Sequence, residues 1–134
     1  KHIKMEDIKF LNLFETQRLN WKDWNHYAHV RMAYLMICKY GLIECDRFII
    51  SGIKSYNQYN RDNIKHGFNS TITWFWIEKI KEKYKKRKYK SSIDFIESNK
   101  DLLNFAQIFD YYSKEELFSD DAKNSIIKVI LFKK

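Results

Sequence analysis

Two histidines, His26 and His29, are the residues whose type and spacing point most directly to chemistry. They stand three positions apart, so on a helix they share one face. Two imidazoles on one face could hold a metal ion between them, or act as acid and base on a bound substrate. The structural alternative is a pair of core histidines bonded to carbonyl or tyrosine groups. The spacing lacks the glutamate and the four-residue step of a zincin helix, so it names no reaction.

Polar and aromatic side chains elsewhere in the chain could complete a pocket around these histidines. Several apolar walls with a few convergent polar groups are the usual make-up of a small-molecule site. Ordinary structural roles compete with this reading, since Asn69 can simply cap a helix and Asn57 can simply end one. We predict that the ligand-binding residues are Trp24, His26, His29, Tyr56, Asn57, Asn69, Thr73 and Trp76.

A run of basic residues in the segment 79–90 is the second candidate site. The formal net charge of the chain is +8, and residues 78–90 hold eight basic and two acidic side chains. Such a run could track the phosphates of a nucleic acid or bind an acidic partner. The alternative is a solvated helix end, where the helix dipole favours positive charge. The residues that would carry this binding are Lys83, Lys85, Lys86, Arg87, Lys88 and Lys90.

The segment 25–40 is the element that must position the two histidines. Its only full charges are Arg31 and Lys39. A helix that is apolar on most of its faces is usually buried on several sides, so we expect it at the centre of the fold. Gly41 is suited to end it. The face that holds the histidines continues through Ala33, Met36, Ile37 and Tyr40.

Helical patterns follow one another along the rest of the chain. We predict helices over 6–15, 42–59 and 71–88, and further short helices after residue 91. Gly52, in the middle of the third helix, could permit close approach of the central helix. The tail 126–132 is ambiguous between a last helix and an extended arm, and it could dock on a partner or on a second copy. Because the chain has no proline and only three glycines, we expect an all-α, single-domain bundle of five to seven helices.

Composition narrows the classes of protein further. The length of 134 residues fits one domain. Cys38 and Cys45 show no metal-ligand spacing, so we expect reduced core thiols in a cytoplasmic protein. No stretch approaches the roughly 20 apolar residues of a membrane span. No phosphate-binding, dinucleotide or serine-hydrolase motif is present. The sequence therefore leaves open which cofactor, if any, the protein uses and whether it is an enzyme.

Five motifs occur in order along the chain and together resemble a family of small, uncharacterised bacterial proteins. Those proteins share W-x-H-x-A-H-L, G-I-x-x-Y-N, G-Y-H-E-T-I-T-x-F-W and Y-S-x-E-x-L-F-S patterns, preceded by F-L-x-x-F-E. The matching stretches here are FLNLFE at 10–15, WNHYAHV at 24–30, GIKSYN at 52–57, GFNSTITWFW at 67–76 and YSKEELFSDDA at 112–122.

The resemblance implies a shared polar cluster suited to a metal or to acid–base chemistry, not a named activity. Here Asn69 and Ser70 stand where the family has its His-Glu pair. This replacement implies a binding site or a degenerate enzyme site. An amide can donate a hydrogen bond to one nitrogen of a neutral imidazole or accept one from the other. We therefore expect His26, His29 and Asn69 to form one hydrogen-bonded, metal-free cluster.

Overall fold

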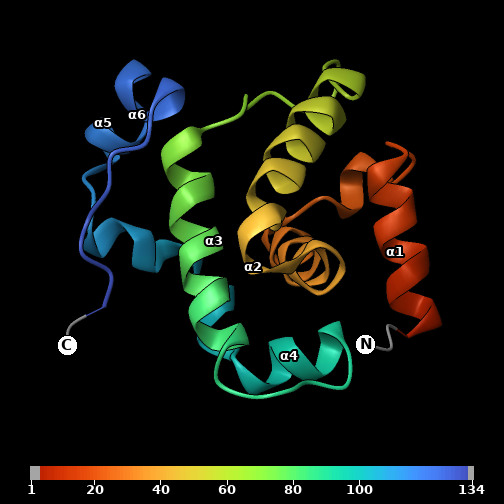
Figure 1. The fold of residues 1–134 in the computed structure, drawn as a ribbon. Coiled ribbons are helices and arrows are strands. Elements are labelled where there is room, and N and C mark those ends of the chain that lie inside the picture. Colours follow the sequence, from red (N-terminus) through yellow and green to blue (C-terminus); the bar gives the residue numbers. More distant parts are fainter. Residues whose placement is uncertain (1–3, 133–134) are drawn as a thin grey trace.

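The computed structural model describes residues 4–132, and every regular element in that range is a helix (Figure 1). With the two halves of α2 counted separately, the described residues form seven α-helices, as the all-α prediction of five to seven expects. No helix in the described range is long and apolar enough to cross a membrane. The α-helices are α1 (Met5–Glu15), α2 (His26–Tyr59), α3 (Ser70–Tyr84), α4 (Ser92–Ser98), α5 (Lys114–Leu117) and α6 (Asp120–Asn124), and the 3₁₀ helices are η1 (Trp21–Asp23), η2 (Lys100–Leu103) and η3 (Phe105–Asp110).

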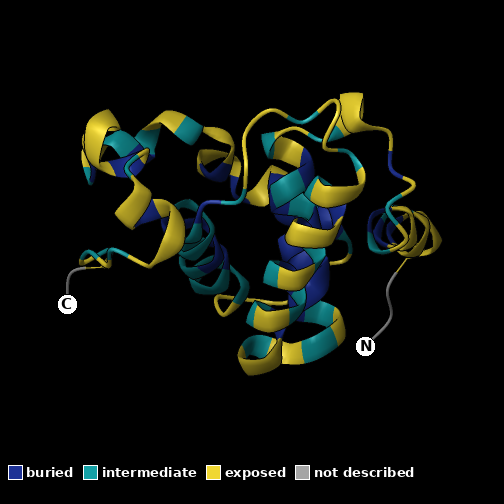
Figure 2. Ribbon diagram, turned by 90° about the horizontal axis from the view of Figure 1, so that it is seen from above, coloured by how far each residue is buried: buried dark blue, intermediate teal, exposed yellow. Residues whose placement is uncertain are grey.

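The first half of α2 is the centre of the fold, as predicted. Six consecutive residues from Met32 to Ile37 are buried, so every side of this helix is covered. Helices α1, α3 and α4 pack against α2, which Figure 1 shows in part end-on between them. In Figure 2 the exposed residues of α1 lie on its outer side, whereas α3 consists of buried and intermediate residues. Ala33 and Met36, which carry the predicted inner face, are 4% and 1% exposed.

Gly41 divides α2 into two helices without an intervening loop. Its φ of 88° and ψ of 168° lie in a region that is essentially open only to glycine. The chain therefore turns at this single residue, and the second half of α2 runs on to Tyr59. This confirms that the central helix ends near Gly41 and that another begins at once. It also brings Ile49 and Ile53 back over the first half of the helix.

Gly52 permits a close approach, but its nearest neighbour is Phe14 of α1 and not the backbone of the central helix. A Cβ atom at position 52 would stand 2.9 Å from Cε2 of Phe14 and 3.7 Å from the Cε of Met36. The Phe14 ring is fully buried and stacks on Trp24, with ring centroids 4.8 Å apart. This ring has little room to move aside, so the contact holds α1 against α2.

We expect Gly52→Ala to lower the free energy of unfolding by about 1–3 kcal/mol, because the added methyl group overlaps the Phe14 ring. Helix propensity alone would favour the alanine by about 1 kcal/mol, so a loss would identify the overlap as the cause. Urea unfolding measures the difference. The matched control is Ser55→Ala on an exposed side of the same helix. Equal or greater stability in Gly52→Ala would contradict the close contact.

Helix α3 begins as predicted and ends earlier. Asn69 is its N-cap, and its side chain accepts a hydrogen bond from the backbone N–H of Ile72 at 2.9 Å. The helix ends at Tyr84, although the sequence pattern predicts it to residue 88. The residues beyond Tyr84 are mostly lysine and have no apolar face to bury, and packing of such a face supplies most helical stability in proteins.

The segment 126–132 is an extended arm, which decides between the two predicted conformations. Two side chains attach its start to the helices. The Oγ1 of Thr71 accepts a hydrogen bond from the N–H of Ile127 at 3.0 Å, and the Tyr112 hydroxyl donates to the carbonyl of Ile127 at 2.5 Å. Ile127, Val129 and Leu131 pack against the core, so part of this arm docks on its own chain.

A buried polar network joins the three helices α1, α2 and α4. The Asp7 carboxylate of α1 is 2% exposed. Its Oδ1 accepts hydrogen bonds from Arg31 Nη2 of α2 at 3.0 Å and from the Ser92 hydroxyl of α4 at 2.5 Å. Its Oδ2 accepts from the backbone N–H of Ser92 at 2.9 Å. One carboxylate thus fixes α1, α2 and the start of α4 to one another.

Candidate functional site

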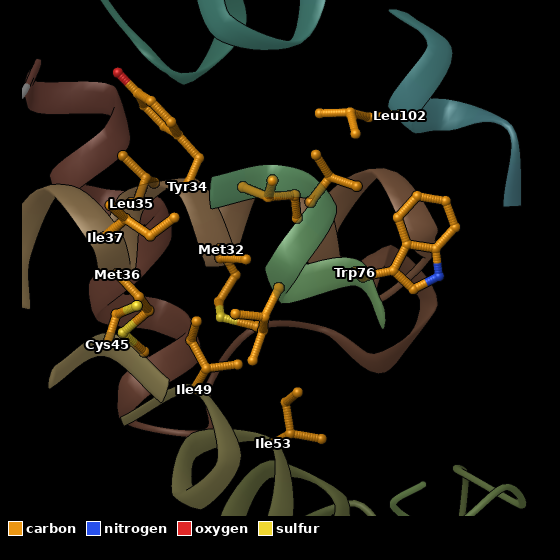
Figure 3. Packing of buried hydrophobic residues seen from close by; sticks show 14 of the residues in the cluster. Met32, Tyr34, Leu35, Met36, Ile37, Cys45, Ile49, Ile53, Trp76 and Leu102 are labelled. Carbon is orange, nitrogen blue, oxygen red and sulfur yellow. The ribbon is translucent and has the colours of Figure 1, made fainter. Parts of the chain in front are cut away.

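The candidate site is a cavity of about 260 Å³ between the two halves of α2, helix α3 and η3. Its wall is mostly aliphatic and aromatic, and it contains no aspartate, glutamate, lysine or arginine. Figure 3 shows Met32, Ile49, Ile53 and Trp76, which all belong to this wall. The polar residues of the lining are Asn25, His26, His29 and Thr73, and the apolar ones are Trp24, Val30, Met32, Ala33, Ile49, Ile53, Ile72, Trp76, Ile77, Ile80 and Phe105.

His26 is the first residue of α2 and is held by a carbonyl group far away in the sequence. Its Nε2 donates a hydrogen bond to the backbone oxygen of Leu102 at 2.8 Å. The ring meets Trp76 and Phe105 edge-on, with centroid distances of 4.5 and 5.4 Å. Burial lowers the pKa of His26, and the Leu102 hydrogen bond offsets part of that effect. The ring is therefore neutral at pH 7.

His29 lies one turn further along α2, against Trp24. The two rings stack with centroids 3.7 Å apart, and Nδ1 of His29 donates to the backbone oxygen of Asn25 at 2.7 Å. Burial lowers the pKa of His29 to about 4, although the Asn25 hydrogen bond acts in the opposite direction. Nearby His26 lowers this pKa slightly further. His29 is therefore a neutral imidazole under ordinary conditions.

Trp76 contributes a buried polar group without a partner. Its indole N–H is the single buried side-chain nitrogen or oxygen that lacks a hydrogen bond within residues 4–132. Leaving such a donor unpaired costs roughly 1–3 kcal/mol. The ring is 7% exposed and borders the cavity, and Thr73 borders the cavity one turn earlier on α3. Both residues are where the sequence predicts a ligand contact.

Asn57 and Asn69 border a neighbouring hollow of about 280 Å³ and not the main cavity. The loop residue His66 lies there as well. Five residues line both hollows, so the two are adjacent: Trp24, His29, Ile53, Ile72 and Thr73. The predicted ligand-binding residues therefore border two adjacent hollows, which the sequence does not distinguish.

The predicted cluster of His26, His29 and Asn69 does not form. The Asn69 amide is already committed, because its Oδ1 caps α3 and its Nδ2 donates to the carbonyl of Leu117 at 2.9 Å. Each histidine likewise binds a backbone carbonyl. Each of the three side chains therefore forms its hydrogen bonds with backbone groups and none with another member of the trio. The prediction of one mutually bonded trio is wrong.

Tyr56, a predicted ligand contact, does not line the cavity and instead packs against Trp24, which does. Its side chain is fully buried, and its hydroxyl donates to the carbonyl of Leu19 at 2.6 Å. The ring packs on Phe14 and Trp24, with centroid distances of 5.6 and 5.0 Å. Tyr56 belongs to neither hollow and instead holds Trp24 in place.

The basic segment 79–90 is largely engaged in ion pairs. Lys81 Nζ lies 2.7 Å from Asp46 Oδ1, and the Arg87 guanidinium also donates to the Ser98 hydroxyl at 2.6 Å. Four of the six residues predicted to bind nucleic acid have an acidic partner. The pairs are Lys83–Asp101, Lys85–Glu82, Lys86–Glu82 and Arg87–Asp94, with N–O distances of 3.2, 3.8, 4.0 and 3.8 Å.

Several residues of the cavity wall are missing from the sequence prediction. Met32, Ile49 and Ile77 look like ordinary core residues, and nothing in their spacing marks a cavity. Phe105 lies on a short 3₁₀ helix, where no helical periodicity is available to place it. A hydrophobic pattern shows that a side chain is buried, but not whether the space beside it is filled.

No group of three or more histidine, cysteine, aspartate or glutamate side chains in the described part of the chain could hold a metal ion. Comparison of the chain with family models, with curated proteins and with solved structures finds no match. The resemblance in the motifs at 24–30 and 67–76 therefore stays a prediction. Support for a function comes from the shape and chemistry of the histidine cavity.

Proposed function

We propose that this protein binds a small, largely apolar molecule in the cavity beside His26 and His29. The observation that carries the proposal is the composition of the wall, which is mostly apolar with a few polar groups. Ligand pockets of proteins have this make-up, with volumes of about 300–1,000 Å³. A cavity of about 260 Å³ lies just below this range and suits a one- or two-ring molecule.

The rigid frame around the cavity supports a binding function. The histidine end is fixed by two carbonyl hydrogen bonds, and Trp24 is held between His29 and Phe14. The opposite wall consists of buried residues of α2 and α3. A preformed site loses little free energy to ordering when a ligand enters.

Filling the cavity tests the proposal. Ala33 lines it and is buried, so Ala33→Leu should place additional carbon atoms in the ligand's space. With indole as the probe, we expect the wild-type protein to bind and its melting temperature to rise with probe concentration, because a ligand of the native state stabilises it. Ala33→Leu should bind indole at least about tenfold more weakly, while its own melting temperature stays equal or rises because the new side chain fills a cavity.

The matched control is Ala106→Leu, which adds the same atoms at an exposed position. It should bind indole as the wild type does. Calorimetric titration and thermal melts measure both properties. Equal indole binding by Ala33→Leu and Ala106→Leu would place the probe outside the cavity, and absence of binding to the wild type would refute the proposal.

A nucleic-acid or acidic-partner function through residues 79–90 receives no specific support from the geometry. Acidic neighbours already compensate most of its cations, and phosphates would have to displace them. The helix dipole accounts for the positive charge of Lys81 and Lys83 in the last turn of α3.

A further inference from the structure

We propose that the ligand of this cavity is an uncharged molecule that presents a hydrogen-bond donor, an N–H or O–H group, to the unpaired ring nitrogens of His26 and His29. This inference rests on the proposed binding function and specifies the chemical class of the ligand. It follows from which nitrogen of each ring carries its proton, and from the absence of charge in the wall.

Backbone carbonyls fix the protonation of both rings. A carbonyl oxygen only accepts hydrogen bonds, so the nitrogen facing it must carry the proton. This nitrogen is Nε2 in His26, opposite Leu102, and Nδ1 in His29, opposite Asn25. A neutral imidazole has one proton, so Nδ1 of His26 and Nε2 of His29 each keep a lone pair. Neither lone pair has a hydrogen-bond partner within the described residues.

Both rings line the cavity and each keeps an unpaired acceptor, which favours a ligand with a donor. An apolar ligand that fills the space would displace water from these nitrogens and leave them unpaired. A ligand N–H or O–H group restores the lost hydrogen bond, so displacement of water then costs little. The indole N–H of Trp76 does not change this preference, because its nitrogen has almost no accessible surface at which a ligand atom could accept.

The same wall disfavours charged ligands. It contains no lysine or arginine to pair with an anion and no carboxylate to pair with a cation. A carboxylate would also meet the lone pairs of the two histidines, which accept hydrogen bonds and offer none. Transfer of an unpaired charge into such surroundings is strongly unfavourable.

Three probes of equal heavy-atom number test the donor and the charge separately: indole, benzofuran and benzoate. Indole and benzofuran have nearly the same shape, but only indole carries an N–H group. We expect the wild-type protein to bind indole about tenfold more tightly than benzofuran, as one hydrogen bond to a desolvated partner allows. Benzoate should bind more weakly than both. Calorimetric titration gives the three affinities.

Single substitutions identify the acceptor. His29→Phe keeps a flat ring against Trp24 but removes the lone pair, and His26→Phe does the same at the other position. The preference for indole over benzofuran should fall toward one in at least one of the two variants. His66→Phe is the matched control, because His66 lies in the exposed loop of the neighbouring hollow. It should keep the preference.

A second measurement uses the wild-type protein alone, in case a variant fails to fold. The ¹⁵N resonances of the two unprotonated imidazole nitrogens should shift when indole is added and should not shift in the same way with benzofuran. Unchanged resonances with indole bound would overturn the inference. So would a preference for indole that survives both histidine substitutions.

The two proposals fail in distinguishable ways. Equal affinities for indole and benzofuran would refute the donor inference and leave the proposed apolar binding function intact. Tight binding of benzoate in the cavity would refute only the inference that the ligand is uncharged. If neither indole nor benzofuran binds at millimolar concentration, the proposed function and the inference fail together.

Discussion

Asp7→Ala is expected to lower the free energy of unfolding by about 3–5 kcal/mol, the usual cost of removing one partner from a buried ion pair. The carboxylate is 2% exposed and accepts three hydrogen bonds. Its removal leaves the Arg31 guanidinium without a counter-charge and the backbone N–H of Ser92 without an acceptor. Ser92 is fully buried and the Arg31 side chain is only 19% exposed, so solvent replaces the lost contacts poorly.

Urea unfolding at pH 7 measures this loss, and Glu44→Ala is the matched control. Glu44 forms an exposed ion pair with Arg47 at 2.8 Å, so its removal should cost at most about 1 kcal/mol. The double variant Asp7→Ala with Arg31→Met should recover part of the loss, because it also removes the unpaired charge. A loss in Asp7→Ala no larger than in Glu44→Ala would show that the network contributes little to stability.

The buried half of α2 is the part of the fold that the sequence predicts best. Residues 32–37 are apolar and buried on every side, and Gly41 marks the end of this half because few other residues tolerate the conformation found there. These signals are local, and each depends on a few neighbouring residues. The start of α3 is predictable for the same reason, since Asn69 is a favoured N-cap.

Contacts between distant polar groups are the part that the sequence does not predict. Asp7 and Ser92 are 85 positions apart, and the types of these residues indicate exposed positions. His26 finds its partner in the carbonyl of Leu102, 76 positions away. Every residue has a backbone carbonyl, so no pattern of residue types can identify which one will face a histidine.

The site itself shows the same division between local and distant signals. Thr73 and Trp76 are three positions apart and share one side of α3, which spacing alone predicts. Whether Asn69 joins them depends on the carbonyl of Leu117, which binds its amide and turns the residue into a structural cap. Phe105 closes the cavity from η3, and only the fold places it there.

Acidification is expected to remove up to about 3 kcal/mol of stability through His29 alone. The pKa of this residue falls from an ordinary value of 6.5 in the unfolded chain to about 4 in the folded protein. A lowered histidine pKa means that the folded state favours the neutral ring. This contribution is therefore complete above about pH 6.5 and is lost progressively as the pH falls toward about 4. The lowered pKa of His26 acts in the same direction.

His29→Asn separates this effect from the titration of carboxylates. Its amide can still donate to the Asn25 carbonyl, as Nδ1 of the histidine does, but it carries no titratable proton. Between about pH 7 and about pH 4.5, urea unfolding should show a larger loss of stability in the wild type than in His29→Asn. His66→Asn removes an exposed imidazole instead and should keep the wild-type dependence. Identical pH dependence in the wild type and His29→Asn would mean that the His29 ring is hydrated enough to take up a proton in the folded state, and the cavity beside it would then be wet and polar.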